Sequence, residues 1–173
     1  MALKNIITVP DPLLKSVSKP VNQITGEIKK LLNDMLETMY KAPGIGLAAV
    51  QVGVPLRAVV IDISRDEEKN PLLFINPKIT WRSEETSIYE EGCLSIPNQF
   101  AEIERPASCK VEFLDLEDKK KEIKASGLLS TCLQHEVDHL NGILFVDYLS
   151  KLKKNYIIKK VSKQKKNSEK IVV

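Results

Sequence analysis

The sequence predicts an α+β fold, because its helical and extended segments occupy separate stretches of the chain instead of alternating. One helical pattern lies near the N-terminus, a run of extended segments follows it, and two further helical patterns come last. We expect the extended segments to form antiparallel or mixed β-sheets. No repeat and no interior linker interrupts this order, so residues 1–173 are expected to form a single domain.

The composition indicates a globular protein. A chain of 173 residues that is 43% hydrophobic and 28% charged can bury a core of ordinary size. No apolar run is long enough to cross a bilayer, and the first ten residues lack a signal or transit pattern. Cys93, Cys109 and Cys132 lie far apart, which fits free thiols in a reducing compartment. We therefore expect a cytoplasmic protein that does not contact the membrane.

The net charge of +3 hides an asymmetry. Residues 151–173 contain nine lysines and one glutamate, a balance of 9 − 1 = +8, so the other 150 residues carry 3 − 8 = −5. We expect this segment to be a basic C-terminal helix and tail. Its inner face is expected to carry Leu152, Tyr156, Ile157 and Val161.

The first helix is expected between residues 25 and 41. Thr25 suits the N-cap, and Pro43 with Gly44 marks the end. A buried stripe at helical spacing is formed by Ile28, Leu31, Leu32, Met35, Leu36 and Met39. Before it, residues 11–15 are expected to form a turn into a short helix.

The extended segments follow a glycine-containing stretch. Gly44 and Gly46 flank Ile45, and glycines at this spacing let the backbone approach another chain closely. A phosphate-binding loop is the rival interpretation, but no Lys-Ser or Lys-Thr follows and no strand precedes. Strands are then expected at residues 57–63, 72–77, 78–83, 101–105, 110–116 and 121–125. The last two are expected to form a hairpin.

The central helix is expected between Ser126, as its N-cap, and Gly142, as a left-handed stop residue. It carries the only two histidines of the chain, His135 and His139. Residues at positions i and i+4 share a helix face, so the two imidazoles can bind one divalent metal. Glu136 then lies beside the metal, where it can act as a base on a metal-bound water. We expect the β-sheets to pack around this metal-binding helix.

A third ligand has to come from outside this helix. Cys93 is the best candidate, since one thiolate and two imidazoles leave one tetrahedral position open for water, as in catalytic sites. The alternative for Cys93 is a small buried apolar residue, which is our interpretation of Cys109. Cys132 precedes His135 by three residues, so it is expected to line the cavity and not to coordinate the metal.

Three motifs together carry a resemblance to a known family. Residues 44–51 (Gly-Ile-Gly-Leu-Ala-Ala-Val-Gln), 91–95 (Glu-Gly-Cys-Leu-Ser) and 134–139 (Gln-His-Glu-Val-Asp-His) resemble the signature motifs of peptide deformylase, in the same order and with similar spacing. The similarity extends from the N-terminal Val-Pro-Asp-Pro to the last helix, which is similar to that of the type I enzymes of Gram-negative bacteria.

The resemblance implies an enzyme that removes the formyl group from the N-terminal formyl-methionine of nascent proteins. Cys93, His135 and His139 would hold one metal per chain, natively Fe²⁺, with Zn²⁺, Ni²⁺ or Co²⁺ as possible substitutes. The metal-bound water would attack the formyl carbon, with Glu136 as general base and acid. By similarity, the Gln51 side-chain amide and the backbone N–H of Leu94 would donate hydrogen bonds to the tetrahedral oxyanion.

A methionine pocket is expected beside His135. Leu128, Thr131 and Cys132 lie seven, four and three residues before it, on the same side of the helix. By similarity, Ile45 and Tyr89 complete an apolar wall. Thr131 is less apolar than a slot for methionine alone would favour.

The same resemblance assigns the backbone of residues 44–46 to the substrate peptide, which would add to it as a strand. Glu91 and Gly92 are also expected in the substrate site. Glu91 and Arg105 match a pair that braces this loop in relatives; the alternative is an exposed ion pair of little energetic value. Asp138 points away from the ligand face and is not assigned a role.

Two other functions are considered for the same motifs. A His-Glu-x-x-His endopeptidase would draw its third ligand from a later residue, whereas this chain has no third histidine and Cys93 lies upstream. A zinc-stabilised domain that binds RNA through its lysines would need a fourth protein ligand. For the lysines, the alternatives are a solvated helix face and, by resemblance, docking on the ribosome, without sequence-specific nucleic-acid readout.

Overall fold

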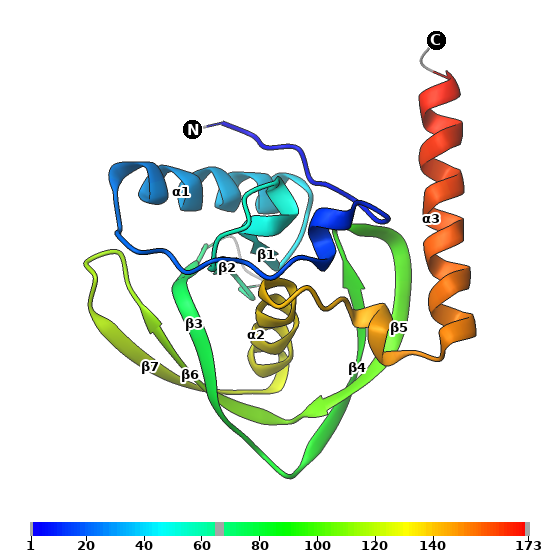
Figure 1. The fold of residues 1–173 in the computed structure, drawn as a ribbon. Helices are drawn as coiled ribbons and strands as arrows, with labels where there is room; N and C mark the ends of the chain where they lie inside the picture. The colour runs from blue at the N-terminus through cyan, green and yellow to red at the C-terminus, as the bar shows by residue number, and fades with distance from the viewer. Residues whose placement is uncertain (1, 65–67, 172–173) are drawn as a thin grey trace.

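The computed structural model describes residues 2–64 and 68–171, so the last two residues of the basic tail lie outside the described part. Figure 1 shows the order of the elements. The helices are α1 Gly26–Lys41, α2 Gly127–Leu140 and α3 Lys151–Ile171, with 3₁₀ turns η1 Pro12–Lys15, η2 Ala49–Val52 and η3 Phe145–Tyr148. The strands are β1 Gly46–Ala48, β2 Ala58–Ile61, β3 Leu72–Arg82, β4 Thr86–Cys93, β5 Ile96–Pro106, β6 Ser108–Leu114 and β7 Lys120–Ser126.

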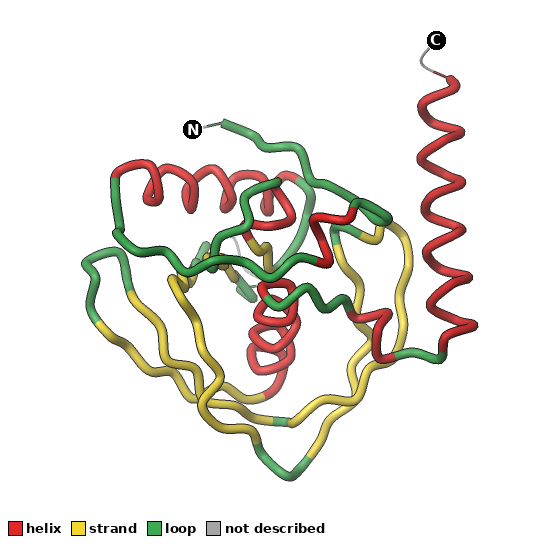
Figure 2. The backbone as a smooth tube through the Cα atoms, viewed as in Figure 1, coloured by secondary structure: helices red, strands yellow, loops and turns green. Residues whose placement is uncertain are grey.

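The strands form two sheets around α2. A five-stranded sheet has the order β1-β2-β3-β6-β7, and β4 pairs with β5 in a separate hairpin. All pairings between these strands are antiparallel. Figure 2 shows the central helix enclosed by strands, with α1 above it and α3 outside β5. The predicted α+β fold with sheets around a central helix is thereby confirmed.

Helix α1 forms as its sequence pattern predicts. The hydroxyl of Thr25 accepts a hydrogen bond from the backbone N–H of Ile28 at 3.4 Å and caps the first turn. Met35 and Met39 are fully buried, and they pack in one cluster with Leu47 and Val60 of the five-stranded sheet. The helix thus covers part of one face of the sheet, and strand β1 lies beside α2 (Figure 1).

The chain enters α2 directly from β7, which differs from the expected capped start. Ser126 occupies the N-cap position, but its side chain makes no capping hydrogen bond. Ser126 is still paired with Ser108 as the last residue of β7, and Gly127 at φ +59° provides the turn into the helix. Gly142 has φ +72°, as expected for a residue just beyond a helix end.

Several predicted strands have other bounds. The segments 72–77 and 78–83 fall in one strand, β3, which pairs with β6 across two register shifts, one between Ile75 and Lys78 and one between Ile79 and Trp81. The strand expected at 101–105 is the middle of the longer β5. Among the described residues, no helix has the length and apolar character needed to cross a membrane.

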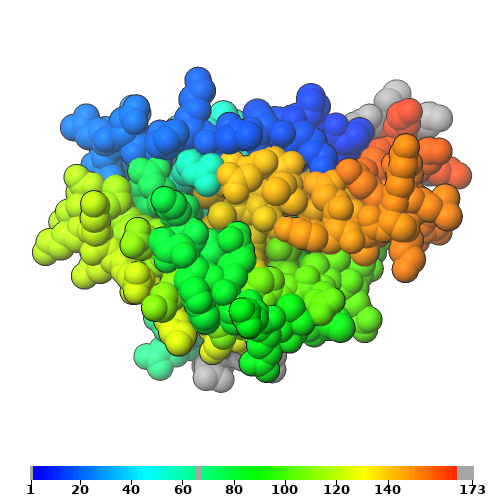
Figure 3. All heavy atoms as spheres, turned by 60° about the horizontal axis from the view of Figure 1, so that its bottom comes forward, coloured from blue at the N-terminus to red at the C-terminus, as the bar shows by residue number. Residues whose placement is uncertain are grey.

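The expected inner face of α3 is only half right. Ile157 and Val161 are buried in a cluster with Ile96 and Ile103 of β5, as expected. Leu152 and Tyr156 were expected beside them, but they are exposed. The reason is that, at 3.6 residues per turn, the two pairs lie about 100° or more apart around the helix, and α3 meets the body with the side that carries Ile157 and Val161. The later turns of α3 extend past the body (Figure 1). In Figure 3, α3 lies at the rim of the molecule.

Candidate metal centre

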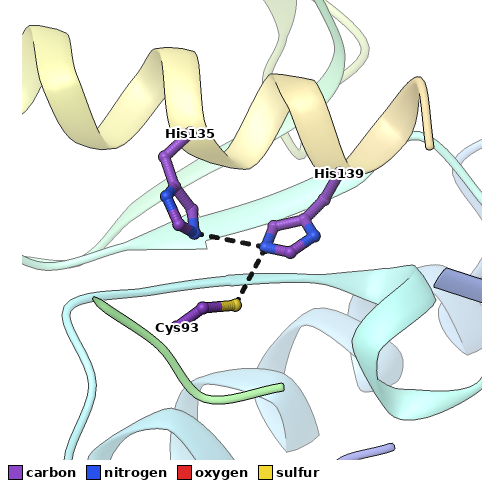
Figure 4. A group of neighbouring side chains, drawn as sticks. All are labelled: Cys93, His135 and His139. Carbon is purple, nitrogen blue, oxygen red and sulfur yellow. Dashed lines mark hydrogen bonds between the residues drawn. The ribbon is translucent and has the colours of Figure 1, made fainter. Parts of the chain in front are cut away.

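Three candidate ligands meet beneath α2 (Figure 4). His135 and His139 project from adjacent turns of α2, and Cys93 ends β4. The Nε2 atoms of the two histidines are 3.2 Å apart, and the Sγ atom of Cys93 is 3.3 Å from Nε2 of His139. All three ligand atoms lie within 4.8 Å of one another. The structure therefore joins a residue from the hairpin to two residues from the helix at one point.

The spacing of these atoms fits a tetrahedral metal ion. Two nitrogens bound at ~2.0 Å in a tetrahedral site lie about 3.3 Å apart, and a sulfur bound at ~2.3 Å lies slightly farther from each of them. Within the described part of the chain, Cys93, His135 and His139 are the complete group, without a fourth His, Cys, Asp or Glu. A donor set of one thiolate and two imidazoles suits iron or zinc better than magnesium.

A buried hydrogen-bond network orients the His135 ring through Nδ1, the ring nitrogen that does not face the other two ligands. This Nδ1 atom lies 2.9 Å from a carboxylate oxygen of Glu91, which directs Nε2 toward the other ligands. Arg105 donates two hydrogen bonds to the same carboxylate, at 2.6 and 3.0 Å, and a third to Asp138 at 2.9 Å. The hydroxyl of Tyr148 donates to Asp138 at 2.7 Å, and the Arg105 guanidinium lies over the Tyr148 ring.

The Glu91–Arg105 pair is not the exposed ion pair considered as an alternative. Glu91 is 6% exposed and Arg105 is 4% exposed. Burial opposes ionisation of Glu91, but hydrogen bonds with His135 and Arg105 outweigh it and hold its pKa below the ordinary value. Asp138 forms an ion pair with Arg105 in this network. Helical periodicity could not reveal this pair, because Arg105 comes from β5.

Glu136 lies beside the ligands in an apolar environment. Its Oε2 atom is buried without a hydrogen-bond partner among the described residues, and burial raises its pKa to about 7. The residue opposite is Gly46, where an added Cβ atom would lie 2.5 Å from Oε1 of Glu136 and 2.9 Å from Sγ of Cys132. Gly46 is thus needed for close packing of β1 against the carboxylate.

Gln51 and Leu94 flank the sulfur of Cys93. The Gln51 side-chain oxygen accepts a hydrogen bond from the backbone N–H of Ala48 at 2.9 Å. This bond orients its amide nitrogen, which lies 3.5 Å from Sγ of Cys93 and 3.1 Å from Oγ of Ser95. The side chain of Leu94 packs against Gly44 so closely that a Cβ atom there would lie 2.7 Å from it.

A cavity of about 630 Å³ opens in front of the cluster. The substrate-site residues expected from the sequence all line it, namely Gly44, Ile45, Gly46, Tyr89, Glu91, Gly92, Leu128, Thr131 and Cys132. Gln51, Cys93, Leu94, His135 and Glu136 also reach this cavity. Sequence reasoning missed the adjoining wall formed by Pro97, Asn98, Gln99 and Phe100. These residues follow the Cys93 motif closely in the sequence, and this proximity could have indicated that they line the same cavity.

The fold and this site together define a metallohydrolase with a Cys-His-His centre and an adjacent buried carboxylate. The chain belongs to the polypeptide deformylase family, whose model matches residues 3–155.

Individual relatives match almost the whole chain. The peptide deformylase of Pelagibacter ubique is 61% identical over 168 residues, which cover 96% of this chain and 98% of the relative. That of Rhizobium meliloti is 58% identical over 167 residues, 96% of each chain. The crystal structure of the peptide deformylase from Ehrlichia chaffeensis in complex with actinonin has a TM-score of 0.91 at 45% identity, covering 95% of this chain and 98% of that one.

Proposed function

We propose that this chain hydrolyses the formyl group from the N-terminal formyl-methionine of nascent proteins, releasing formate and a free amine. The observation that carries the proposal is the convergence of Cys93, His135 and His139 on one point beside Glu136, at the end of a cavity of about 630 Å³. Membership of the polypeptide deformylase family supports the substrate. Because the substrate is a nascent chain, we also propose that the enzyme works in the cytoplasm.

Cys93, His135 and His139 are proposed to hold the metal, one ion per chain. Fe²⁺ is the expected native ion, and Zn²⁺, Ni²⁺ or Co²⁺ can take the same donors. When bound, the metal would lower the pKa of a water molecule and polarise the formyl oxygen. Glu91 keeps the His135 ring oriented through Nδ1, and Arg105, which is itself paired with Asp138, holds Glu91 in turn.

Glu136 is proposed to carry the proton. A carboxylate with a pKa of about 7 can accept a proton from the attacking water and return it to the leaving nitrogen at neutral pH. Its Oε2 atom has no partner within the described structure and is therefore free for this exchange. Gly46 keeps the carboxylate in place, since its lack of a side chain leaves room for Oε1.

Gln51 and the backbone N–H of Leu94 are proposed to stabilise the negative charge that develops on the formyl oxygen. The Gln51 amide nitrogen is already aimed at the ligand Cys93, because its oxygen is tied to the Ala48 backbone. Loss of one such donor costs about 3 kcal/mol in the transition state, or roughly a hundredfold in rate.

The rest of the cavity is proposed to bind the peptide. Leu128, Thr131 and Cys132 on α2, with Ile45 and Tyr89 opposite, would surround the methionine side chain, and Glu91 and Gly92 bound the site. Strand β1 is the end strand of its sheet and, among the described residues, pairs with β2 alone, so its outer edge is open to the substrate from Gly46 onward. In the two residues before it, the Gly44 N–H and the Ile45 carbonyl are already hydrogen-bonded to the backbone of Met39 and Asp62.

The basic helix α3 is proposed to dock on the ribosome. Lys159, Lys163 and Lys166 are exposed on it, which favours contact with a polyanion. Replacing these three lysines with glutamate should reduce co-sedimentation with ribosomes and leave hydrolysis of a short peptide unchanged. Unaltered co-sedimentation across a range of salt concentrations would reject this docking role.

Formate release tests the main proposal. Anaerobically prepared, Fe²⁺-loaded protein should release formate from formyl-Met-Ala-Ser. Glu136→Ala should retain the metal and lose about 10²- to 10⁴-fold in rate. Mass spectrometry of an unformylated peptide serves as the control for endopeptidase activity. Cleavage of its internal bonds without release of formate would favour the endopeptidase and contradict the proposal.

A further inference from the structure

A second hollow lies between β5 and α3, on the outer side of the hairpin that supplies Cys93. We refer to it as the α3 groove. Its lining residues are Gln99, Phe100, Ala101, Glu102, Leu149, Leu152, Lys153, Tyr156 and Ile157. Three large apolar side chains of this groove are exposed: Phe100 by 63%, Leu152 by 82% and Tyr156 by 64%. Charged side chains, including Glu102 and Lys153, stand among them.

The exposed side chains of the α3 groove are not needed to hold the helix. Ile157 and Val161 already anchor α3 in the cluster with Ile96 and Ile103. Leu152 and Tyr156 lie on the same helix but outside this cluster. Exposed apolar groups gathered in a groove with polar neighbours are typical of a binding surface. These side chains therefore have no role in the fold that would explain them.

The α3 groove continues the catalytic cavity. Gln99 and Phe100 line both hollows. The Phe100 ring lies across the hairpin over Gly92, so closely that a Cβ atom at residue 92 would be 2.6 Å from it. Gly92 directly precedes the ligand Cys93, so one wall runs from the metal centre to the groove.

The length of this path matches a few residues of peptide. Phe100 pairs with Gly92 across the hairpin, so it lies one strand spacing, roughly 5 Å, from the residue next to Cys93. An extended peptide advances about 3.3 Å per residue. A chain whose first residue is fixed at the metal centre can therefore pass Phe100 and enter the groove within its next few residues.

We propose that the α3 groove binds apolar side chains of the nascent substrate, a few residues downstream of the formyl-methionine. This proposal rests on the proposed deformylase function. The continuous wall through Phe100 favours the substrate as the occupant over an unrelated partner. The lysines at residues 159, 160, 163, 165 and 166 follow the groove along α3, so ribosome docking uses a different part of the helix.

The test compares peptides within each enzyme variant. Three Fe²⁺-loaded proteins are assayed: the wild type, the double variant Leu152→Ser with Tyr156→Ser, and Val17→Ser, a control that removes an exposed apolar side chain lining neither hollow. The substrates are formyl-Met-Ala-Ser and two nine-residue extensions of it, one with leucine and one with serine at positions 5 and 6. The readout is the ratio of kcat/KM for the leucine peptide to that for the serine peptide.

Wild type and Val17→Ser should prefer the leucine peptide about five- to tenfold, as expected for partial burial of two leucines. The double variant should reduce this ratio to about one to two. A ratio near one in the wild type, or a preference that persists in the double variant, overturns the proposal. So does loss of self-association by the double variant in sedimentation experiments with an unchanged ratio, because the groove then binds a second copy. Failure of the wild type on formyl-Met-Ala-Ser instead refutes the deformylase function itself.

Discussion

Helices α2 and α3 break the usual distribution of side chains in opposite directions. On α2, polar groups are buried: Gln134, His135, Glu136 and His139 are all buried. On α3, apolar groups are exposed, with Leu152 and Tyr156 in contact with solvent. Buried polar groups need partners, and exposed large apolar groups mark a binding surface. The two departures therefore point to a metal centre on one helix and a docking surface on the other.

The buried polar groups of α2 depend on residues from other elements. Glu91 from β4 and Arg105 from β5 meet His135 and Asp138. In α3, by contrast, the exposed side chains have few neighbours, so their removal should matter little for folding. The four predictions that follow test this contrast, and they are ordered from the largest expected effect to the smallest.

Arg105→Met should lower the free energy of unfolding by about 3–5 kcal/mol, because it leaves the buried carboxylate of Glu91 without its partner. Urea denaturation of the metal-free proteins measures this change. The matched control is Lys29→Met, which removes the partner of the exposed Glu117 and should cost about 0.5 kcal/mol or less. Equal effects of the two substitutions would show that the buried network has no special energetic role.

Gly46→Ala should reduce kcat by up to about a hundredfold, because the added methyl group displaces the Glu136 carboxylate by a fraction of an ångström to an ångström. Gly26→Ala is the control, since a Cβ atom there meets nothing within 4 Å. Formate release under saturating substrate gives kcat for both variants. Full activity of Gly46→Ala would mean that the position of Glu136 is less constrained than the packing indicates.

Asp147 lies between α2 and α3 in the sequence, and its lowered pKa makes its contribution to the stability of the fold depend on pH. Burial raises its pKa, but the backbone N–H of Leu144 and the ammonium groups of Lys15 and Lys154 outweigh burial and hold the pKa below 3.8. A carboxyl with a lowered folded-state pKa stabilises the protein above pH 4, and this contribution is lost as the pH falls through its folded-state pKa.

Asp147→Asn should therefore cost about 1 kcal/mol at pH 7 and progressively less below pH 4. Thermal or urea unfolding of the variant and the wild type across this range measures the difference. A cost that stays constant down to pH 2 would indicate that the amide fails for steric reasons and that charge is not the cause.

Leu152→Ala should change the free energy of unfolding by no more than about 0.5 kcal/mol, because its side chain is almost fully exposed. Ile157→Ala, on the same helix but in the core cluster, should cost about 2–4 kcal/mol. Urea denaturation of the pair separates the two faces of α3. A large cost for Leu152→Ala would mean that this side chain supports the fold, and it would remove the basis for the α3 groove as a docking surface.

Local sequence patterns were sufficient for features that depend on neighbours a few residues away. The spacing of His135 and His139 predicts a shared helix face, because helix geometry alone fixes positions i and i+4. The stripe ending in Met35 and Met39 predicts the buried face of α1 for the same reason. Metal-ligand chemistry selected Cys93 from outside the helix, and the family motifs extended the prediction to Gln51.

Only the tertiary structure decided what depends on contacts between distant segments. It buries Arg105 between Glu91 and Asp138, and it brings Gly46 against Glu136. It also exposes Leu152 and Tyr156 and buries Ile157 and Val161. At 3.6 residues per turn these two pairs lie on different sides of the helix, about 100° or more apart. Helix geometry fixes that separation, but only the packing of α3 on β5 decides which of the two sides is buried.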